Sequence, residues 1–462
     1  MKKRIISSIL SMIIIITIAV GCSTGDEGSQ TTEQETFAGD RDLQTTEQET
    51  FAGDETVVII HVEAAPLLQP SANDYAAQAV ATGANDFAFR LSALLAQDAG
   101  NDNLIVSPYS VWLPLAALLN ATDEVNRDAL LEALGAGGVS VDDVNRAASR
   151  MLFDLTNSGT GFLENQLHIA NAVFVDHNLT LRRDFAQTFA DYFRGTVMEV
   201  DFASHKAVDA VNQWASDNTD GLITDIIERF NPLTVAAIAN AIYFQDRWLS
   251  EFNPALTRQD VFHSPTGAST AYFMQREAYM FYFEDDILQA VRLPFTYGGG
   301  LYILLPRYGG AVDLLSNMTA EYFLHIFSNS HETPGKLLLP RFSLESKIDL
   351  PETLIALGVP LFCAVSAPLT TGLVYENSPL WVEDAVQKAV IEVDEKGTTA
   401  AAVTVMDIPE EGPPPSPFAP FEMLCDRPFV FVLYQTTLDG GAQVLFSGMV
   451  NQPIAVYHFS EN

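Results

Sequence analysis

One segment near the carboxyl end combines a glycine turn with a run of small, uncharged residues, a pattern suited to backbone movement. Residues 386–393 (VQKAVIEV) predict a strand that enters a turn at Asp394–Gly397. Residues 398–405 are all Thr, Ala or Val, and alternate positions form a small or apolar face without charge. This run could therefore enter a sheet without burying a charged group. The face consists of Thr398, Ala400, Ala402, Thr404, Met406 and Ile408.

The same run leads into a proline-rich stretch, residues 410–420. Proline removes a backbone donor and fixes φ, so this stretch can form neither a helix nor a central strand. A segment able to form a strand thus continues into an extended, exposed loop. An ordinary edge strand followed by a surface loop fits this window equally well.

Motifs for enzymatic chemistry are missing from the sequence. It contains no HExxH zinc motif, no P-loop and no GxGxxG after a predicted strand. One GxSxG match, residues 21–25, has neither a strand before it nor a helix after it, and we attribute it to chance. Cys363 and Cys425 lie in apolar or strand-like surroundings, which predicts buried free thiols, with disulfide pairing as the alternative. A Ser/His/Asp triad is not local in sequence and has no single motif of this kind.

A third cysteine, Cys22, follows an apolar N-terminal segment. Basic residues at positions 2–4 precede Ile5–Val20, which at 16 residues is short of the ~20 that a membrane span takes. Residues 1–21 therefore read as a signal peptide. The sequence Ala19-Val20-Gly21-Cys22 resembles the bacterial lipobox, although Leu is more usual at the position of Ala19. That resemblance implies cleavage before Cys22 and lipid on its thiol; the alternative is a signal peptide without lipid.

Residues 22–75 predict an acidic, low-complexity tether. The segment QTTEQETFAGD occurs twice, at 30–40 and at 44–54, and residues 22–74 hold 12 acidic residues against one basic residue, Arg41. Low hydrophobicity and one-sided charge favour a solvated chain over a packed core. Its function would be to hold the folded domain away from the membrane, and a binding peptide is the alternative.

The composition of the whole chain excludes some classes of protein. Of its 462 residues 48% are hydrophobic, which excludes a wholly disordered protein. The formal charge of -35 argues against a nucleic-acid partner, because such proteins need a basic surface.

The folded part reads as one α+β domain, residues 76–462, with helices mainly in its first half and strands in its second. We expect a helix over Asn85–Ala96 with Asn85 as its cap, and another from Pro108 to Leu119. The strand-like stretches are 300–306, 336–342, 428–434 and 444–450.

The turn and run at residues 395–404 (EKGTTAAAVT) resemble the reactive-loop hinge of the serpins, the serine-protease-inhibitor superfamily. Further matches follow in the family's order over nearly all of 76–462, and together they are highly specific although each alone is weak. They are 103–105 with 107–110, 171–174, Asn212, Trp214, Thr219, Gly221, Ile223, 240–244, Trp248, Phe252, 293–295, 339–342, 428–431 and 445–448.

The resemblance implies a fold of three β-sheets and about nine helices, with an exposed reactive loop near the carboxyl end. It also implies a metastable protein, not an enzyme and without a cofactor or metal, that acts as a monomer. A target serine protease cleaves the loop and is held as a covalent acyl-enzyme, while the amino-side half of the loop inserts into a sheet as a new strand. The implied hinge comprises Glu395, Gly397, Thr398, Ala400, Ala401, Ala402 and Thr404. The implied strand-opening region comprises Ser107, Pro108, Ser110, Asn240 and Gln387.

Three departures from the family pattern matter. The family commonly has His at position 387, where it helps to latch the central strands; Gln387 can donate and accept, so we expect an altered but working latch. Lys396 stands where Glu is frequent and should face solvent. The loop is longer than usual, which affects the target bond: the family's usual spacing from Gly397 predicts cleavage at Glu411-Gly412. The second choice is Glu410-Glu411, and Phe418-Ala419 is a further alternative.

The sequence therefore predicts a protease inhibitor anchored by Cys22 at the extracellular face of a bacterial membrane, or secreted. A non-inhibitory serpin acting as a binding module is the main alternative, and cysteine proteases are an alternative target class. A secreted peptidase is a third possibility that no residue pattern favours.

Overall fold

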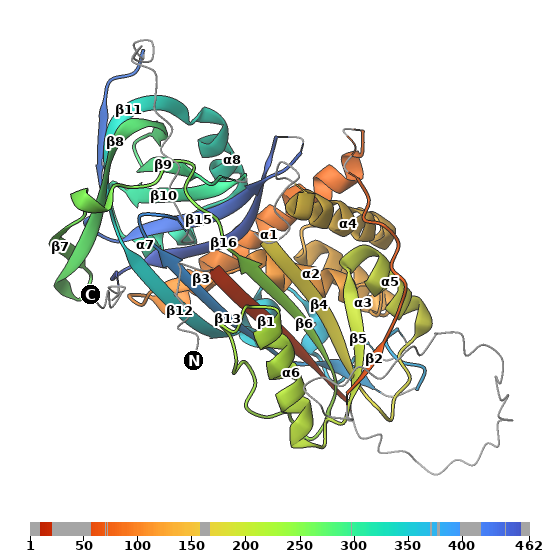
Figure 1. The fold of residues 1–462 in the computed structure, drawn as a ribbon. Helices are drawn as coiled ribbons and strands as arrows, with labels where there is room; N and C mark the ends of the chain where they lie inside the picture. The colour runs from red at the N-terminus through yellow and green to blue at the C-terminus, as the bar shows by residue number, and fades with distance from the viewer. Residues whose placement is uncertain are drawn as a thin grey trace, which may run out of the picture.

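The computed structural model shows two β-sheets with helices packed around them (Figure 1). The residues described are 10–20, 57–69, 71, 73–157, 167–296, 298–369, 372–376, 379–397, 417–438 and 440–453.

The first sheet has seven strands and holds the predicted strand before the hinge turn. That strand, β13, runs from Leu380 to Val393 and lies near one edge of the sheet, and β4 and β5 form a parallel pair within an otherwise antiparallel arrangement. In spatial order the strands are β12 (Phe342–Asp349), β13, β1 (Leu10–Val20), β6 (Thr234–Phe244), β4 (Leu167–Asp176), β5 (Gly195–Val200) and β2 (Val58–Ile60).

The second sheet has nine strands. Eight follow one another as β14 (Phe421–Leu424), β11 (His331–Pro340), β8 (Gly267–Glu284), β9 (Leu288–Pro294), β10 (Gly300–Pro306), β15 (Phe429–Thr436), β16 (Ala442–Val450) and β3 (Leu104–Val106), and β7 (Arg258–Ser264) pairs with β8. The four strand-like stretches of the sequence correspond to β10, β11, β15 and β16. The α+β class is confirmed, but within the described residues hydrogen bonding forms two networks instead of three. Within the nine-stranded network, the long β8 pairs with β7 through its first residues and with β9 through its last.

Nine α-helices occur in the described residues, as the resemblance implied. They are α1 (Tyr75–Ala99), α2 (Pro108–Leu118), α3 (Glu124–Ala133), α4 (Val141–Asn157), α5 (Arg183–Phe193), α6 (His205–Asp217), α7 (Ala311–Ser316), α8 (Ala320–Asn329) and α9 (Pro351–Ala356). Short 3₁₀ turns in the described ranges lie at Pro254–Leu256 and Pro360–Phe362.

The helix predicted from Pro108 is confirmed, but the cap predicted for the preceding helix is wrong. α1 begins earlier, at Tyr75, and its N-cap is Asp74, whose side chain accepts from the Ala77 N–H. Asn85 instead lies buried within α1, where its carboxamide donates to the Ala442 carbonyl and accepts from the Val444 N–H of β16. A side chain that joins two elements explains why a polar residue stands inside this helix.

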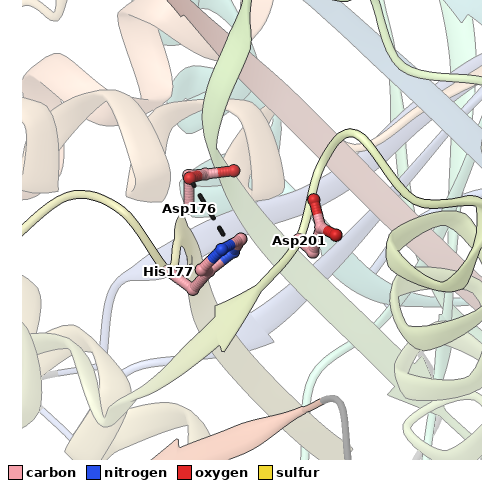
Figure 2. Close-up of side chains that lie close together, drawn as sticks. All are labelled: Asp176, His177 and Asp201. Carbon is pink, nitrogen blue, oxygen red and sulfur yellow. Dashed lines mark ion pairs between the residues drawn. The ribbon is translucent and has the colours of Figure 1, made fainter.

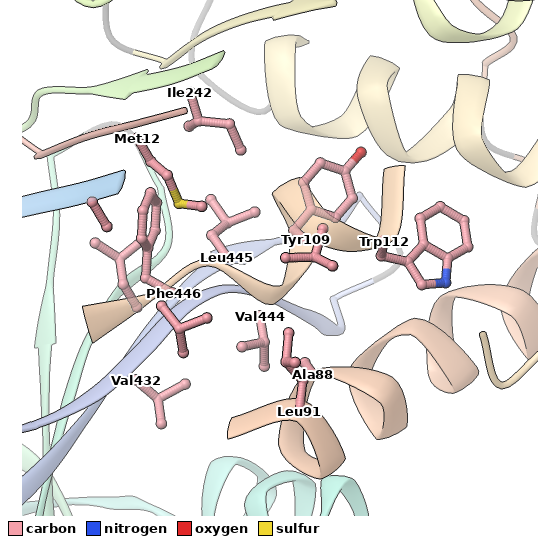
Figure 3. Close-up of a cluster of buried hydrophobic side chains, with 14 of the residues drawn as sticks. Met12, Ala88, Leu91, Tyr109, Trp112, Ile242, Val432, Val444, Leu445 and Phe446 are labelled. Carbon is pink, nitrogen blue, oxygen red and sulfur yellow. The ribbon is translucent and has the colours of Figure 1, made fainter. Parts of the chain in front are cut away.

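The seven-stranded sheet separates two hydrophobic cores. On one face α6 contributes Val211 and Trp214 to the smaller core, which also holds Ile13 of β1. On the other face α1, α2, α4 and α5 pack into the main core, which extends to the second sheet. Figure 3 shows Met12 of β1 in this main core, near Ile242 of β6 and Leu445 of β16.

The folded unit extends further toward the N-terminus than residue 76. Val57 is buried, and β2 pairs antiparallel with β5 at the edge of the first sheet. The Ala65 N–H donates to the Asp191 carboxylate at 2.7 Å, and the Leu68 N–H donates to Ser149 at 3.0 Å. Residues 57–69 therefore lie against the domain and not in a free tether, because β2 covers the sheet edge and Val62 and Leu67 pack against the main core. The repeated segment lies outside the described residues.

The apolar N-terminal segment forms a strand inside the first sheet. Leu10–Val20 is β1, and Met12 to Ile16 have at most 1% of their surface exposed. Cleavage after residue 21 and lipid on Cys22, which lies outside the described residues, stay predictions. In the part of the chain that the structure describes, no helix is both long and apolar enough to cross a membrane.

The two downstream cysteines differ in environment. Both thiols are free, and Cys425 is buried as predicted, whereas Cys363 is exposed. Burial raises the pKa of the Cys425 thiol, while hydrogen bonding with Ser366 lowers that of Cys363. The prediction of burial was wrong for Cys363 because this residue follows a 3₁₀ turn and is not part of a strand.

Candidate functional site: the hinge and the opening of the sheet

The hinge turn, Asp394–Gly397, reverses the chain at the end of β13. Asp394 and Gly397 form an antiparallel bridge, and Gly397 forms a second bridge with Arg247, just beyond β6. The φ of Gly397 is +119°, and a Cβ there would lie 2.7 Å from the Arg247 Cα and 2.6 Å from the Trp248 N. Only glycine fits this backbone and this close approach. The first bridge places Gly397 beside Asp394, next to the end of β13.

Backbone hydrogen bonds hold the turn against the segment that follows β6. The Trp248 N–H donates to the Lys396 carbonyl at 3.0 Å, and the Phe252 N–H donates to the Glu395 carbonyl at 2.8 Å. The Trp248 indole N–H donates to the Asp394 carbonyl at 2.9 Å, and its ring stacks on Phe295 with 5.0 Å between centroids. The turn is therefore anchored on one side although it leads into the loop.

Glu395 is the buried charge of this turn. Its side chain is 6% exposed, and its Oε1 accepts from Arg341 Nη2 at 2.6 Å and Nε at 2.9 Å. The Thr257 hydroxyl donates to the same oxygen. The ion pair with its extra donor compensates the desolvation of the carboxylate. Lys396, by contrast, is exposed, as the sequence predicted.

The predicted strand-opening residues gather where α2 meets the first sheet. Ser107 caps α2 by accepting from the Ser110 N–H at 3.3 Å, and Pro108 occupies the first turn. Gln387 of β13 bonds both backbone groups of Ser107, accepting from its N–H at 3.2 Å and donating to its carbonyl at 3.0 Å. Gln387 therefore uses both the donor and the acceptor of its side-chain amide.

Asn240 lies across the opening from Gln387. Its Nδ2 donates to Asn171 Oδ1 at 2.9 Å, and Asn171 in turn donates to the Phe193 carbonyl at 2.6 Å. Asn240 Oδ1 is buried and has no hydrogen-bond partner among the described residues. Gln387 and Asn240 do not touch, because Ile14 of β1 pairs with both of them.

β1 fills the opening between β6 and β13. It is antiparallel to both neighbours, so β6 and β13 run parallel to each other on either side of it. A hairpin that returned from Gly397 would also run antiparallel to β13. The sheet therefore accepts an additional strand at this position, in the direction that the loop would take.

Several predicted residues lie outside the described part of the chain. They are Cys22, Thr398, Ala400, Ala401, Ala402, Thr404, Glu410, Glu411 and Gly412. Of the alternative cleavage site, Phe418 is described: it is 44% exposed and stacks on His331, with 5.3 Å between ring centroids.

Sequence reasoning did not single out a cluster of acidic and imidazole side chains at the ends of β4 and β5. Figure 2 shows Asp176, His177 and Asp201, whose possible ligand atoms lie within 4.8 Å of one another. Asp176 Oδ1 accepts from the N–H and the amide of Asn178, and Asp201 Oδ1 accepts from the Ala203 N–H. Both carboxylates therefore cap local turns of the backbone. No further observation on the described residues points to a ligand.

Comparisons with known proteins agree with this geometry. The family model described as "Serpin (serine protease inhibitor)" matches residues 82–453. An uncharacterized serpin-like protein of Thermococcus kodakarensis is 31% identical over 385 residues, covering 81% of this chain and 86% of that protein. Plasminogen activator inhibitor 1 of Mus musculus is 30% identical over 384 residues, covering 80% and 92%.

Solved structures show the same fold. Tengpin, a thermophilic serpin in its native state, superposes with a TM-score of 0.72 at 24% identity, covering 85% of this chain and 97% of that one. Serpin48 of the insect Tenebrio molitor superposes with a TM-score of 0.70 at 27% identity, covering 83% and 100%.

The buried ion pair at the turn yields a stability prediction. Replacing Arg341 with Met leaves the Glu395 carboxylate buried without its cation, so the free energy of unfolding should fall by about 3 kcal/mol. Urea unfolding followed by circular dichroism measures it. The control Lys396→Met removes an exposed cation of the same turn and should change stability by no more than about 0.5 kcal/mol. Equal stability of the two variants would contradict the anchoring role of the pair.

Proposed function

The chain belongs to the serpin family, and we propose that it inhibits serine proteases by inserting its cleaved loop between β6 and β13. The observation that carries the proposal is the opening itself, where the first sheet accepts an extra strand antiparallel to both neighbours. The hinge turn begins a return in that direction at Gly397. The loop residues supply a small, uncharged face for this position.

The register of the hinge turn says where each loop residue would lie. Asp394 pairs with Gly397, so a continued hairpin would place Thr398 opposite Val393 and Thr404 opposite Gln387. Thr404 would then also lie beside Asn240, since Ile14 now pairs with both Gln387 and Asn240. Directly opposed residues of antiparallel strands point to the same face. A threonine hydroxyl there could donate to Asn240 Oδ1, which has no partner among the described residues while Ile14 occupies the position.

Insertion supplies the driving force for trapping. A new central strand forms hydrogen bonds along both edges, each with a net contribution of roughly 1 kcal/mol. Cleavage frees the loop to move, and the protease attached to its carboxyl end moves with it. The small face of the loop favours rapid insertion, which must outrun hydrolysis of the acyl bond.

We also propose that the domain is held at the extracellular face of a bacterial membrane. The basic residues at positions 2–4, the short apolar segment and Cys22 support it. Two acyl chains on one cysteine would give stable anchoring, which a single chain does not.

The mechanism predicts a covalent complex. The chain beginning at residue 22, incubated with a panel of serine proteases, should form with its target a 1:1 complex that survives boiling in SDS. Cleavage of the loop should also raise the melting temperature sharply, because a strand is added to the sheet. If cleaved and intact chains melt together, insertion does not occur and the mechanism fails.

The hinge predicts a switch from inhibitor to substrate. Thr398→Arg places a guanidinium beside buried Val393, and even about 1.4 kcal/mol added to the barrier slows insertion about tenfold. The variant should be cut at the same bond but retain little complex on SDS gels. The control Thr399→Arg places the same charge beside Glu392, which is half-buried, and should still inhibit. Unchanged inhibition by Thr398→Arg would remove the role assigned to this face.

Loop length predicts the cleaved bond. A cut at Glu411-Gly412 keeps the inserting strand short, whereas a cut at Phe418-Ala419 adds slack that lets the trapped protease keep its geometry. Mass spectrometry of the fragment released from a trapped complex should find Gly412 at its N-terminus. A fragment that begins with Ala419 would show that the argument from slack is wrong.

The anchor predicts a change of location. Cys22→Ser removes the thiol that would carry lipid, so the chain should leave the membrane fraction or stay unprocessed. Fractionation and intact mass measure both. Retention in the membrane with normal processing would count against lipidation.

A further inference from the structure

The segment that fills the opening of the first sheet belongs to the predicted signal peptide, not to the loop. We propose that the space between β6 and β13 is a binding site for the chain's own apolar N-terminal segment, Leu10–Val20, and that a chain retaining this segment cannot insert its loop. The locking rests on the proposed function, whereas the binding does not.

Pairing runs along nearly the whole segment. Residues Ser11–Val20 have Cα partners in β13, and Leu10–Ala19 have partners in β6. Beyond the end of the pairing with β6, the Val20 N–H donates to the Leu233 carbonyl at 3.0 Å. The segment is therefore bound through both edges of its backbone, as a central strand is.

The side chains fit both faces of the sheet. Met12, Ile14 and Ile16 are fully buried in the main core, and Ile13 and Ile15 are buried in the core under α6. Branched aliphatic residues suit a strand that is buried on both faces. The polar side chains of the segment are small hydroxyls, Ser11 and Thr17, so its insertion buries no charge.

The bound segment and the inserted loop exclude each other. Ile14 pairs with Gln387 and Asn240, the position that the hinge register assigns to Thr404. One strand position cannot hold both backbones. A chain that keeps β1 in place would therefore be cut by a protease as a substrate, without trapping it.

Processing would then act as activation. A cut before Cys22 detaches residues 1–21, which include all of β1, and leaves β6 and β13 free to part for the loop. The reaction that exposes Cys22 for lipid attachment is thus the one that removes the covalent link to the occupant of the site.

The first arm of the test measures binding in the full chain, produced without export so that residues 1–21 remain. Hydrogen–deuterium exchange with mass spectrometry should show strong protection of residues 11–19. Ile14→Asp puts a carboxylate at a fully buried position and should abolish that protection; Ile16→Asp repeats the test at a second buried position. Val20→Asp puts the same charge at the half-buried end of the strand and should keep most of it. Rapid exchange of 11–19 in the unchanged chain would overturn the proposal.

The second arm measures access to the site with a probe independent of any protease. A fluorescent synthetic peptide of residues 398–408 should bind the Ile14→Asp chain at least tenfold more tightly than it binds the unchanged chain or Val20→Asp. Equal binding by all three would overturn the locking. If Ile14→Asp accepts the peptide but the chain from residue 22 traps no protease, the binding site stands and the proposed inhibitory function fails.

Discussion

The first sheet can hold one more strand between β6 and β13, and the rest of the molecule is organised around which segment takes that place. Parallel neighbours separated by one antiparallel strand define its direction, and buried residues on both faces define its chemistry. The segment that occupies this position must be extended and uncharged, and it must run antiparallel to both β6 and β13. β1 meets these conditions in the structure, and the run after Gly397 meets them in sequence.

The hinge turn gives the loop a fixed starting point. Gly397 can approach Arg247 and Trp248 because it lacks a Cβ. Glu395 of the same turn forms a buried ion pair with Arg341. An anchored turn keeps the register of the first inserted residue constant, so alternate residues reach the same face each time. Gln387 and Asn240 lie on opposite sides of the opening. Each forms a hydrogen bond with a neighbouring element, and they form none with each other.

Local signals in the sequence predicted much of this arrangement. Ser107 and Pro108 mark the start of α2 because a cap and a first-turn proline act through adjacent backbone, and the alternation before Asp394 marks β13. Asn85 was misread as a cap because its partners lie on β16, far away in sequence. The places of residues 57–69 and β1 in the fold could not be predicted for the same reason. The periodicity of a short apolar run does not show that it pairs with a sheet formed by distant residues. The isoleucines of β1 are equally suited to an export signal and to a strand buried on both faces.

The most direct test of the account is a crystal structure of the chain from residue 22 after cleavage of its loop. Residues 398–404 should then form a strand between β6 and β13, antiparallel to both, with Thr404 opposite Gln387 and beside Asn240. Direct pairing of β6 with β13, with the cleaved loop outside the sheet, would contradict it.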